Sequence, residues 1–466
     1  MLQRMNERKA AQQSGSKAVL DYIRDITDEQ SFVELDAYSF SAGEFFEDAE
    51  GAGEGVVTGY ARIGGLPVYI AAQNPNVFSG ALTKAQSDKI LKCMNLAHKS
   101  GSALVYLLAS SGARVGEGLS VLDGYAQIIA KSSALYGEVP QISVISGDCY
   151  GSIAYFAALS DVVFVKKGAH AGSTSAAVLS AKSGSAVSAD GAAGSGALIK
   201  NGFASAEAED AADLKEKLSA VLEALEGDVR ELSEAELNVS FDALDEGYTA
   251  QKIIDGVLDG GVFTELGAGC GDSLKTGFAR VGGISAGVIL SADDEGGALL
   301  TAEAADKASS FIRLLDSFGV PLITFVNVSG TELSVEAESR GIVKSVGWLM
   351  SAVSDHGGAK LAVVCGKAQG AGYTALASKA LGFDYTLSWA TASISVLPGD
   401  VAVSTVYSAQ LAEKKAGDGD RKRLAEKYAR IEGDPFNAAH RGLVDNIIQP
   451  AATRQYVISA LQMLAL

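Results

Sequence analysis

Four short glycine turns have the residue types and spacing to bind an anion through the main chain. They are "SSGAR" (110–114) and "GDCYGS" (147–152) in the first half, and "VSGTE" (328–332) and "KAQGAG" (367–372) in the second half. Each follows an apolar run and precedes a predicted helix, so N–H groups at the helix start can point at one oxygen. Two such turns facing each other form an oxyanion hole, where each preorganised donor contributes ~2.7–4 kcal/mol of transition-state stabilisation. The sequence thus predicts main-chain catalysis, and the simpler alternative is that these glycines only turn the chain.

Other kinds of catalytic site fit the sequence less well. A G-x-S-x-G pattern occurs at 283–287, but a nucleophile elbow needs a strand before it and a helix after it. Its Ser285 corresponds, in the internal repeat described below, to Pro67 inside a predicted hairpin. "GAGCGD" (267–272) lacks the glycine spacing of dinucleotide and nucleoside triphosphate sites. These patterns argue against a serine nucleophile and against a nucleotide-binding loop.

Histidine and cysteine are placed for packing rather than for metal binding. No histidine lies at metal-ligand spacing to another; the four are His98, His170, His356 and His440. The cysteines are far apart, without a C-x-x-C pair; they are Cys93, Cys149, Cys270 and Cys365. We therefore expect no metal site, surface or packing roles for the histidines, and buried thiols.

An internal repeat carries the glycine turns. "TGYARIGG" (58–65) returns as "TGFARVGG" (276–283), and the match continues without a gap, so that 59–112 aligns with 277–330. Chance does not hold such a register. Self-similarity at a fixed offset is the signature of duplicated structural units. The sequence therefore predicts two copies of one domain.

Each copy shows the same predicted elements. A strand pair lies around "GLPVYIAAQ" or "GISAGVILS", and a helix follows from Thr83 or Thr301, both suited as N-caps. Next come a buried parallel strand, "ALVYLLASSG" or "PLITFVNVSG", a helix, and the strand "QISVISGD" or "KLAVVCGK", which leads into the second turn and a further helix. Strand–turn–helix units in this order build a parallel sheet covered by helices. We expect an α/β fold with domains at 1–248 and 249–466 and an acidic connector at 207–250.

Composition narrows the class of partner. With 466 residues, 48% apolar and 20% charged, the chain is long enough for two globular domains. Its formal charge of −18 disfavours nucleic acid and anionic lipid, although a small anion could bind where basic residues gather. The N-terminus has no signal-peptide core and no run of 18 apolar residues occurs, so we expect a cytoplasmic protein.

The same segments resemble a known enzyme family. "SSGARVGEGLSVLDGYAQI", "VPQISVISGDCYGS", "KAQGAGYTALASKALGFDYTLSWATASISVLPG" and "GLVDNII" are similar to carboxyltransferase subunits of biotin-dependent acyl-CoA carboxylases and decarboxylases, in the family's order. The resemblance runs from about residue 18 to the C-terminus. It implies two crotonase-like (ClpP/crotonase) domains of repeated β-β-α units, the first holding acyl-CoA and the second holding biotin. A duplicated fold would then supply one oxyanion hole for each substrate.

The resemblance also implies site residues. Those that it places at the acyl-CoA hole are Gly112, Ala113, Gly151 and Ser152, with Arg114 beside them. Those on the biotin side are Gly330, Thr331, Gly370 and Ala371, followed by Tyr373 and by Thr374 at the position where the family tunes acyl-chain size. The alternative role for Arg114 is a salt bridge with Glu117, three residues further along. The chain departs from the family's usual Gly-Gly turns at Ser111 and Ser152, and Thr331 adds a further side chain near a ligand position.

Activity and partners follow from the resemblance as expectations. We expect a carboxyltransferase component that moves carboxyl between biotin and the carbon alpha to a thioester, without a metal. We also expect a homo-oligomer built from dimers, usually a hexamer. The chain has no Met-Lys-Met biotinylation motif and no ATP-binding motif, so a biotin carboxyl carrier protein and a biotin carboxylase are expected partners. The alternatives are the alpha subunit of a decarboxylase sodium pump with a membrane partner, and a degenerate CoA-binding paralogue. The acyl group, the direction of transfer and the contacts to the CoA phosphates stay open.

Overall fold

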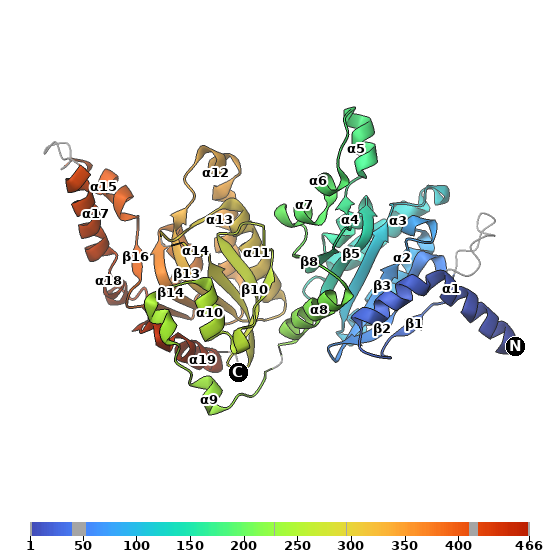
Figure 1. The fold of residues 1–466 in the computed structure, drawn as a ribbon, viewed down its shortest axis with the longest axis horizontal. Coiled ribbons are helices and arrows are strands. Elements are labelled where there is room, and N and C mark those ends of the chain that lie inside the picture. Colours follow the sequence, from blue (N-terminus) through green and yellow to red (C-terminus); the bar gives the residue numbers. More distant parts are fainter. Residues whose placement is uncertain (1, 40–52, 228, 295, 410–417, 465–466) are drawn as a thin grey trace. The chain divides into compact units, whose positions relative to one another are not determined.

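The computed structural model describes residues 2–39, 53–227, 229–294, 296–409 and 418–464 (Figure 1). It divides into two compact units, Met1–Glu223 and Ala224–Leu466. The division lies inside the acidic segment 207–250, whose composition predicts a connector. Across the ranges described, the structure contains no helix with the length and apolar character that a membrane span requires.

The first unit is built on a sheet that is mainly parallel. Its described strands pair in the order β1-β2-β3-β4-β5-β6-β8, and β7 pairs with β5. The strands are β1 (Val33–Leu35), β2 (Val56–Ile63), β3 (Leu66–Gln73), β4 (Ala103–Ser110), β5 (Gln141–Tyr150), β6 (Val162–Lys166), β7 (Ala171–Gly172) and β8 (Ala206–Ala208). Its helices are α1 (Leu2–Ile26), α2 (Lys84–Ser100), α3 (Ser120–Leu135), α4 (Ser152–Ala157), α5 (Ala176–Ser183), α6 (Ala189–Ala193) and α7 (Ser195–Lys200), while α8 (Ala211–Glu226) contains the division.

The second unit repeats this sheet. The described strands pair in the order β17-β15-β14-β13-β11-β10-β9, with β12 on β13 and β16 on β14. They are β9 (Thr264–Leu266), β10 (Leu274–Val281), β11 (Ile284–Ser291), β12 (Ala298–Leu300), β13 (Leu322–Thr331), β14 (Lys360–Gln369), β15 (Tyr385–Trp389), β16 (Ser393–Ser395) and β17 (Asn446–Ile448). The helices are α9 (Glu234–Leu237), α10 (Ala250–Val257), α11 (Ala302–Ser317), α12 (Val335–Ser339), α13 (Ile342–Asp355), α14 (Ala371–Ala377), α15 (Gly399–Val406), α17 (Asp418–Glu432), α18 (Pro435–His440) and α19 (Thr453–Leu464).

The predicted α/β duplication is confirmed strand by strand. β2 and β3 form an antiparallel hairpin in which Ala61 lies opposite Val68, and β10 and β11 do the same with Ala279 opposite Ala286. β3, β4, β5 and β6 are then parallel, as are β11, β13, β14 and β15. The two copies therefore bring the same strand ends to the same edge of each sheet.

The repeated Gly-Gly pair makes the tight turn of each hairpin. Gly64–Gly65 and Gly282–Gly283 all have positive φ, between 58° and 83°, which a two-residue type I′ turn requires and which glycine adopts without strain. An aspartate binds both turn N–H groups in each copy: Asp28 at 3.2 and 2.8 Å, and Asp259 at 3.0 and 2.7 Å. The opening motif of the repeat is thus explained by hairpin geometry.

Helix capping and packing also agree with the sequence. The Thr83 side chain accepts the Gln86 N–H at 3.0 Å and caps α2, and Thr301 accepts the Ala304 N–H at 3.2 Å and caps α11. The four cysteines are free and buried, as predicted. Ser285, the serine of the G-x-S-x-G pattern, lies inside β11 with only 4% of its surface exposed, which does not match a nucleophile elbow.

Candidate active site

In the first unit, two predicted turns lie side by side because their strands are paired. Ser110 at the end of β4 lies opposite Cys149 on β5. Gly112 has φ +117°, and a Cβ placed on it would lie 3.7 Å from the Tyr150 carbonyl oxygen. The structure therefore brings together the four residues predicted for the first site, which are Gly112, Ala113, Gly151 and Ser152.

The glycine N–H groups of the first site are already bound within the protein. The N–H of Gly112 donates to Ser110 Oγ at 3.2 Å, and that of Gly151 donates to the Gly172 carbonyl at 2.9 Å. Ser152 follows as the first residue of α4, where an N–H has no partner within the helix. The sequence motif therefore suggests the glycine N–H groups as donors. In the structure the available N–H belongs instead to Ser152, the residue after Gly151.

Ala113, at the end of the other turn, likewise has an available N–H group. Its neighbours make the hydrogen bonds of a parallel bridge, in which the Leu82 N–H donates to the Gly112 carbonyl at 2.8 Å and the Arg114 N–H donates to the Leu82 carbonyl at 3.0 Å. In the chain as described, neither Ala113 nor Ser152 gives its N–H to a main-chain or side-chain acceptor. These two N–H groups are therefore the main-chain donors that can bind an anion at the first site.

The second unit repeats this geometry. Val328 lies opposite Ala368 on the paired strands β13 and β14, and a Cβ on Gly330 (φ +112°) would lie 3.8 Å from the Gln369 carbonyl oxygen. The Gly370 N–H donates to the Ser395 carbonyl at 3.0 Å, and Ala371 begins α14. The helix-start donor of the second unit thus again falls one residue beyond the glycine.

These turns open onto a cavity of about 560 Å³ in the second unit. All four residues predicted for the second site line it, namely Gly330, Thr331, Gly370 and Ala371. Its wall also contains apolar side chains, which are Leu299, Leu333, Val396, Leu397, Pro398 and Val401. The cavity thus joins main-chain donors to an apolar surface, the usual composition of a small-molecule site.

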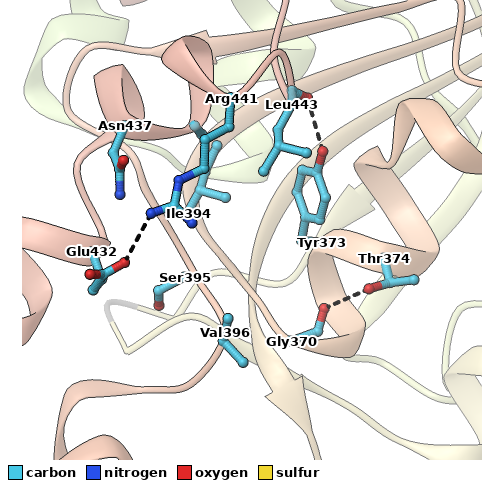
Figure 2. A pocket seen from close by; sticks show the side chains of 11 residues that line it. Gly370, Tyr373, Thr374, Ile394, Ser395, Val396, Glu432, Asn437, Arg441 and Leu443 are labelled. Carbon is cyan, nitrogen blue, oxygen red and sulfur yellow. Dashed lines mark hydrogen bonds and ion pairs between the residues drawn. The ribbon is translucent and has the colours of Figure 1, made fainter.

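Tyr373 and Thr374 line a second, smaller cavity of about 210 Å³ (Figure 2). Gly370 and Val396 border both cavities. The Tyr373 hydroxyl donates to the Leu443 carbonyl at 2.9 Å, and the Thr374 hydroxyl donates to the Gly370 carbonyl at 3.1 Å. Burial, followed by the charge of Asp445, raises the pKa of Tyr373, so its hydroxyl stays protonated. Both side chains are therefore held in place by main-chain acceptors.

The rim of the smaller cavity is polar. Glu432 and Arg441 form an ion pair at 3.7 Å, and Asn437 lines the cavity on the same side (Figure 2). Glu432 ends α17 and Arg441 follows α18, so two elements from the C-terminal part of the unit close this side of the cavity. None of these three residues was predicted from the sequence as a site residue.

Arg114 is tied into the protein beside the first site. Its guanidinium lies 3.6 Å from the centre of the Phe78 ring and 3.9 Å from Glu54. Glu117, the alternative partner named from the sequence, instead accepts the Lys84 N–H at 2.8 Å and so stabilises the start of α2. Arg114 thus has an ion-pair partner, but it is Glu54, which lies far away in the sequence.

His170 has a more specific environment than its sequence position indicates. It lies between two carboxylates, with Nδ1 2.9 Å from Asp148 and Nε2 2.9 Å from Asp190. Hydrogen bonding to Asp148 and then to Asp190 raises the pKa of this imidazole. Asp148 belongs to the strand of the first site and Asp190 to α6, so His170 links that helix to the site. The aspartate inside "GDCYGS" was the one signal available in the sequence.

Comparison with known proteins assigns the family. The carboxyl transferase domain family matches residues 10–465. The propionyl-CoA carboxylase beta chain of Saccharopolyspora erythraea is 32% identical over 99% of this chain and 90% of its own. The methylmalonyl-CoA decarboxylase subunit alpha of Propionigenium modestum is 32% identical over 97% of this chain and 90% of its own.

A solved structure agrees with these relatives. The transcarboxylase 12S hexamer with bound methylmalonyl-coenzyme A superimposes with a TM-score of 0.90 at 29% identity, over 99% of this chain and 95% of that one. The match spans both units and confirms the predicted pair of crotonase-like domains. The chain therefore belongs to the carboxyl transferase family.

Proposed function

We propose that this chain is the carboxyltransferase component of a biotin-dependent acyl-CoA carboxylase, with the acyl-CoA side at 1–248 and the biotin side at 249–466. The observation that carries the proposal is the pair of equivalent turn sites. Each unit offers main-chain N–H donors at two strand ends that lie beside each other. Transfer of carboxyl from a urea nitrogen to a carbon alpha to a thioester develops negative charge on two oxygens, and two holes match that need.

On the acyl-CoA side, Ala113 and Ser152 would hold the thioester oxygen. Their N–H groups are fixed by the hydrogen bonds of Gly112 and Gly151, so the donors need no rearrangement as negative charge develops on that oxygen. Donors of this kind act without a catalytic side chain. The chain has serine at positions 111 and 152, where the family has glycine. Because these differences change side chains and keep the main-chain N–H groups, they leave this chemistry in place.

On the biotin side, the donors near Gly330 and Gly370 would hold the urea oxygen. Biotin combines a polar urea with an apolar bicyclic body, and the cavity of about 560 Å³ pairs main-chain donors with an apolar wall, so the residues fit this group. When bound on its carrier protein, biotin supplies the nitrogen that carries the carboxyl group. The chain's own residues bind the urea, orient it and stabilise charge on its oxygen.

Tyr373 and Thr374 are proposed to select the acyl group by its size. They line a cavity of about 210 Å³ next to Gly370, and small changes in a pocket of this kind shift selectivity by ~10–200-fold per methylene. A short acyl group, of the acetyl or propionyl class, suits this volume. The relatives named for propionyl-CoA and methylmalonyl-CoA agree with that size.

We further propose a homo-oligomer built from dimers, in the form of a hexamer. Apolar side chains beside both sites are exposed, including Val115 at 87%, Leu119 at 82%, Leu333 at 79% and Val335 at 81%. Clustered exposed apolar groups mark interaction surfaces. The similar transcarboxylase 12S assembles as a hexamer, which supports the same arrangement for this chain. A biotin carboxyl carrier protein and a biotin carboxylase would complete the enzyme.

A second candidate is the alpha subunit of a biotin-dependent decarboxylase. The Propionigenium modestum relative supports it, since its identity to this chain is the same as that of the carboxylase relative. The two candidates share the chemistry of the site and differ in the direction of transfer. Carboxylation of propionyl-CoA by the chain together with a carboxylated carrier protein supports the first candidate. Dependence on a membrane partner supports the second.

The test is decarboxylation of malonyl-CoA or methylmalonyl-CoA by the purified chain with free biotin. We expect turnover that rises with biotin concentration and stops when biotin is omitted. Acyl-CoA binding, measured by calorimetry on the same preparation, serves as the control for folding. Acyl-CoA binding without turnover would instead indicate a degenerate CoA-binding paralogue.

A further inference from the structure

The two copies carry opposite charges at one repeated position. Asp148 stands three residues before Gly151 on β5, and Lys367 stands three residues before Gly370 on β14. The backbone around them is the same in both copies, since the strand pairing matches and the first-turn glycines have φ of +117° and +112°. The fold therefore accepts either charge here, and the choice of lysine in the second unit needs another reason.

Lys367 lies on the wall of the larger cavity. Of the described residues that line this cavity, it is the one with a cationic side chain, and Asp294 is the one with an acidic side chain. Asp294 Oδ1 accepts the Gly296 N–H at 2.6 Å, so that oxygen is engaged in the local turn. Among the described residues, no carboxylate comes within ion-pair distance of Lys367, whose charge is thus left for a ligand.

The lysine is held in a defined position. Its main-chain N–H donates to Asn327 Oδ1 at 2.9 Å, and its Nζ donates to the Gly296 carbonyl at 2.5 Å in a solvent-exposed contact. The stem passes over Gly297, where an added Cβ would lie 3.1 Å from Lys367 Cδ. An ammonium group has three N–H donors, so two of them stay free for an anion in the cavity.

We propose that Lys367 binds the carboxylate group that the second-unit site transfers. The inference rests on the proposed function, because it takes the urea of biotin to be bound at the Gly330 and Gly370 turns. Before transfer the negative charge would lie on the carboxylate attached to the urea nitrogen, and it would move to the urea oxygen, at the turns, only as the carboxyl group leaves. In a chain with a net charge of −18, a local cation is required to hold that charge.

A purely structural role for Lys367 makes a different prediction. Lys367 Nζ and Ser329 Oγ both donate to the Gly296 carbonyl, so both help to hold this turn. If Lys367 only held the turn, Ser329→Ala would have the same effect as loss of the lysine. If its charge matters, Ser329→Ala keeps the function and Lys367→Gln loses it. Ser329→Ala is therefore the matched control.

The experiment is a ligand-observed NMR titration of the full chain with two stable probes. One is 2-imidazolidinone, which carries the urea alone, and the other is its N-carboxymethyl derivative, which adds a carboxylate. We expect the wild type, Ser329→Ala and Lys367→Arg to bind the carboxylate probe about tenfold more tightly than the parent, the effect of one charge-assisted hydrogen bond. Lys367→Gln should bind both probes equally, with acyl-CoA affinity and melting temperature unchanged.

The possible failures are distinguishable. A carboxylate preference that survives in Lys367→Gln, or that is absent from the wild type while the parent urea binds, would overturn the role of Lys367 and leave the proposed function standing. Loss of the preference in Ser329→Ala as well would assign Lys367 to holding the turn. If the wild type bound neither probe, the placement of the urea would be wrong, and the inference with it.

Discussion

The carbonyl oxygen of Gly172 accepts the N–H of Gly151 at 2.9 Å. This bond comes from β7, a strand of two residues that the sequence pattern did not predict, and it occupies the donor that the glycine motif suggests. Ser395 does the same to Gly370 at 3.0 Å in the second unit, through β16. In both copies the first free N–H of the helix therefore belongs to the residue after the glycine, which is Ser152 or Ala371.

Ser152→Pro tests this assignment on the acyl-CoA side. Proline is tolerated at the first position of a helix because the N–H there has no helical partner, so the change removes the donor and keeps α4. We expect kcat for biotin-dependent decarboxylation to fall by ~10²–10³-fold, the effect of losing one oxyanion donor. Ser152→Ala keeps the N–H and should retain kcat within about threefold of wild type. Equal losses in the two variants would show that the side chain, not the donor, matters.

Ala371→Pro tests the equivalent donor on the biotin side. Ala371 is the first residue of α14, so the same reasoning applies. We expect kcat with free biotin to fall by ~10²–10³-fold while calorimetric acyl-CoA affinity stays at the wild-type value. Ala371→Ser is the control that keeps the N–H. An unchanged kcat in Ala371→Pro would contradict the assignment of this N–H to the urea oxygen.

The sequence predicted the scaffold well because the duplication preserves register. The hairpin glycines, the threonine caps and the four turns all depend on residues close together in the chain, and each prediction was checked by its copy. The contacts that decide which N–H is free were not predictable, because they link turns to short strands far along the chain. Likewise the partner of Arg114 is Glu54 rather than the neighbouring Glu117. The turns could be predicted from local spacing. Which of their N–H groups are free depends on contacts with segments far along the chain.

Gly112→Ala tests how far the first turn depends on glycine. The φ of +117° lies where an L-residue is strained by roughly 1–3 kcal/mol, although a Cβ would meet the Tyr150 oxygen only at an ordinary 3.7 Å. We expect a lower melting temperature and at least a tenfold loss of kcat, since relief of the strain moves the Ala113 N–H. Gly116→Ala, in open space, should change neither quantity. An unchanged melting temperature in Gly112→Ala would show that the turn can adopt another conformation.

Asp161→Asn tests a buried carboxyl that directly precedes β6 in the first unit. Burial raises the pKa of Asp161 from 3.8 to about 6, and the hydrogen bond that one oxygen accepts from the Gln141 N–H at 2.7 Å offsets only part of this rise. The other oxygen is buried without a partner in the described structure. An acid whose pKa rises on folding contributes stability below its unfolded pKa, and that stability is lost as the pH rises through about 6. The wild type is therefore penalised at pH 8, and the asparagine variant is not.

The measurement for Asp161→Asn is the melting temperature at two pH values. We expect the variant to gain roughly 2–4 °C over wild type near pH 8, the shift that about 1 kcal/mol produces in a unit of this size. Near pH 4 the carboxyl is protonated in the folded state and only partly ionised in the unfolded state, whose pKa is 3.8, so most of the penalty is absent and the gain should largely disappear. A gain of the same size at both pH values would mean that ionisation of Asp161 is not its cause.

His170→Gln tests the link between α6 and the first site. The imidazole lies between Asp148 and Asp190, and its pKa is raised above the ordinary value of 6.5. The stabilisation is therefore complete below that value and is lost as the pH rises through the raised pKa. We expect amide protection of residues 189–200, measured by hydrogen exchange and corrected for intrinsic rates, to be higher at pH 6 than at pH 9 in wild type. In His170→Gln the protection should be low at both pH values, whereas His98→Gln, at an exposed position on α2, should behave as wild type. Protection in His170→Gln equal to that of wild type at pH 6 would show that α6 is held by its main-chain contacts alone.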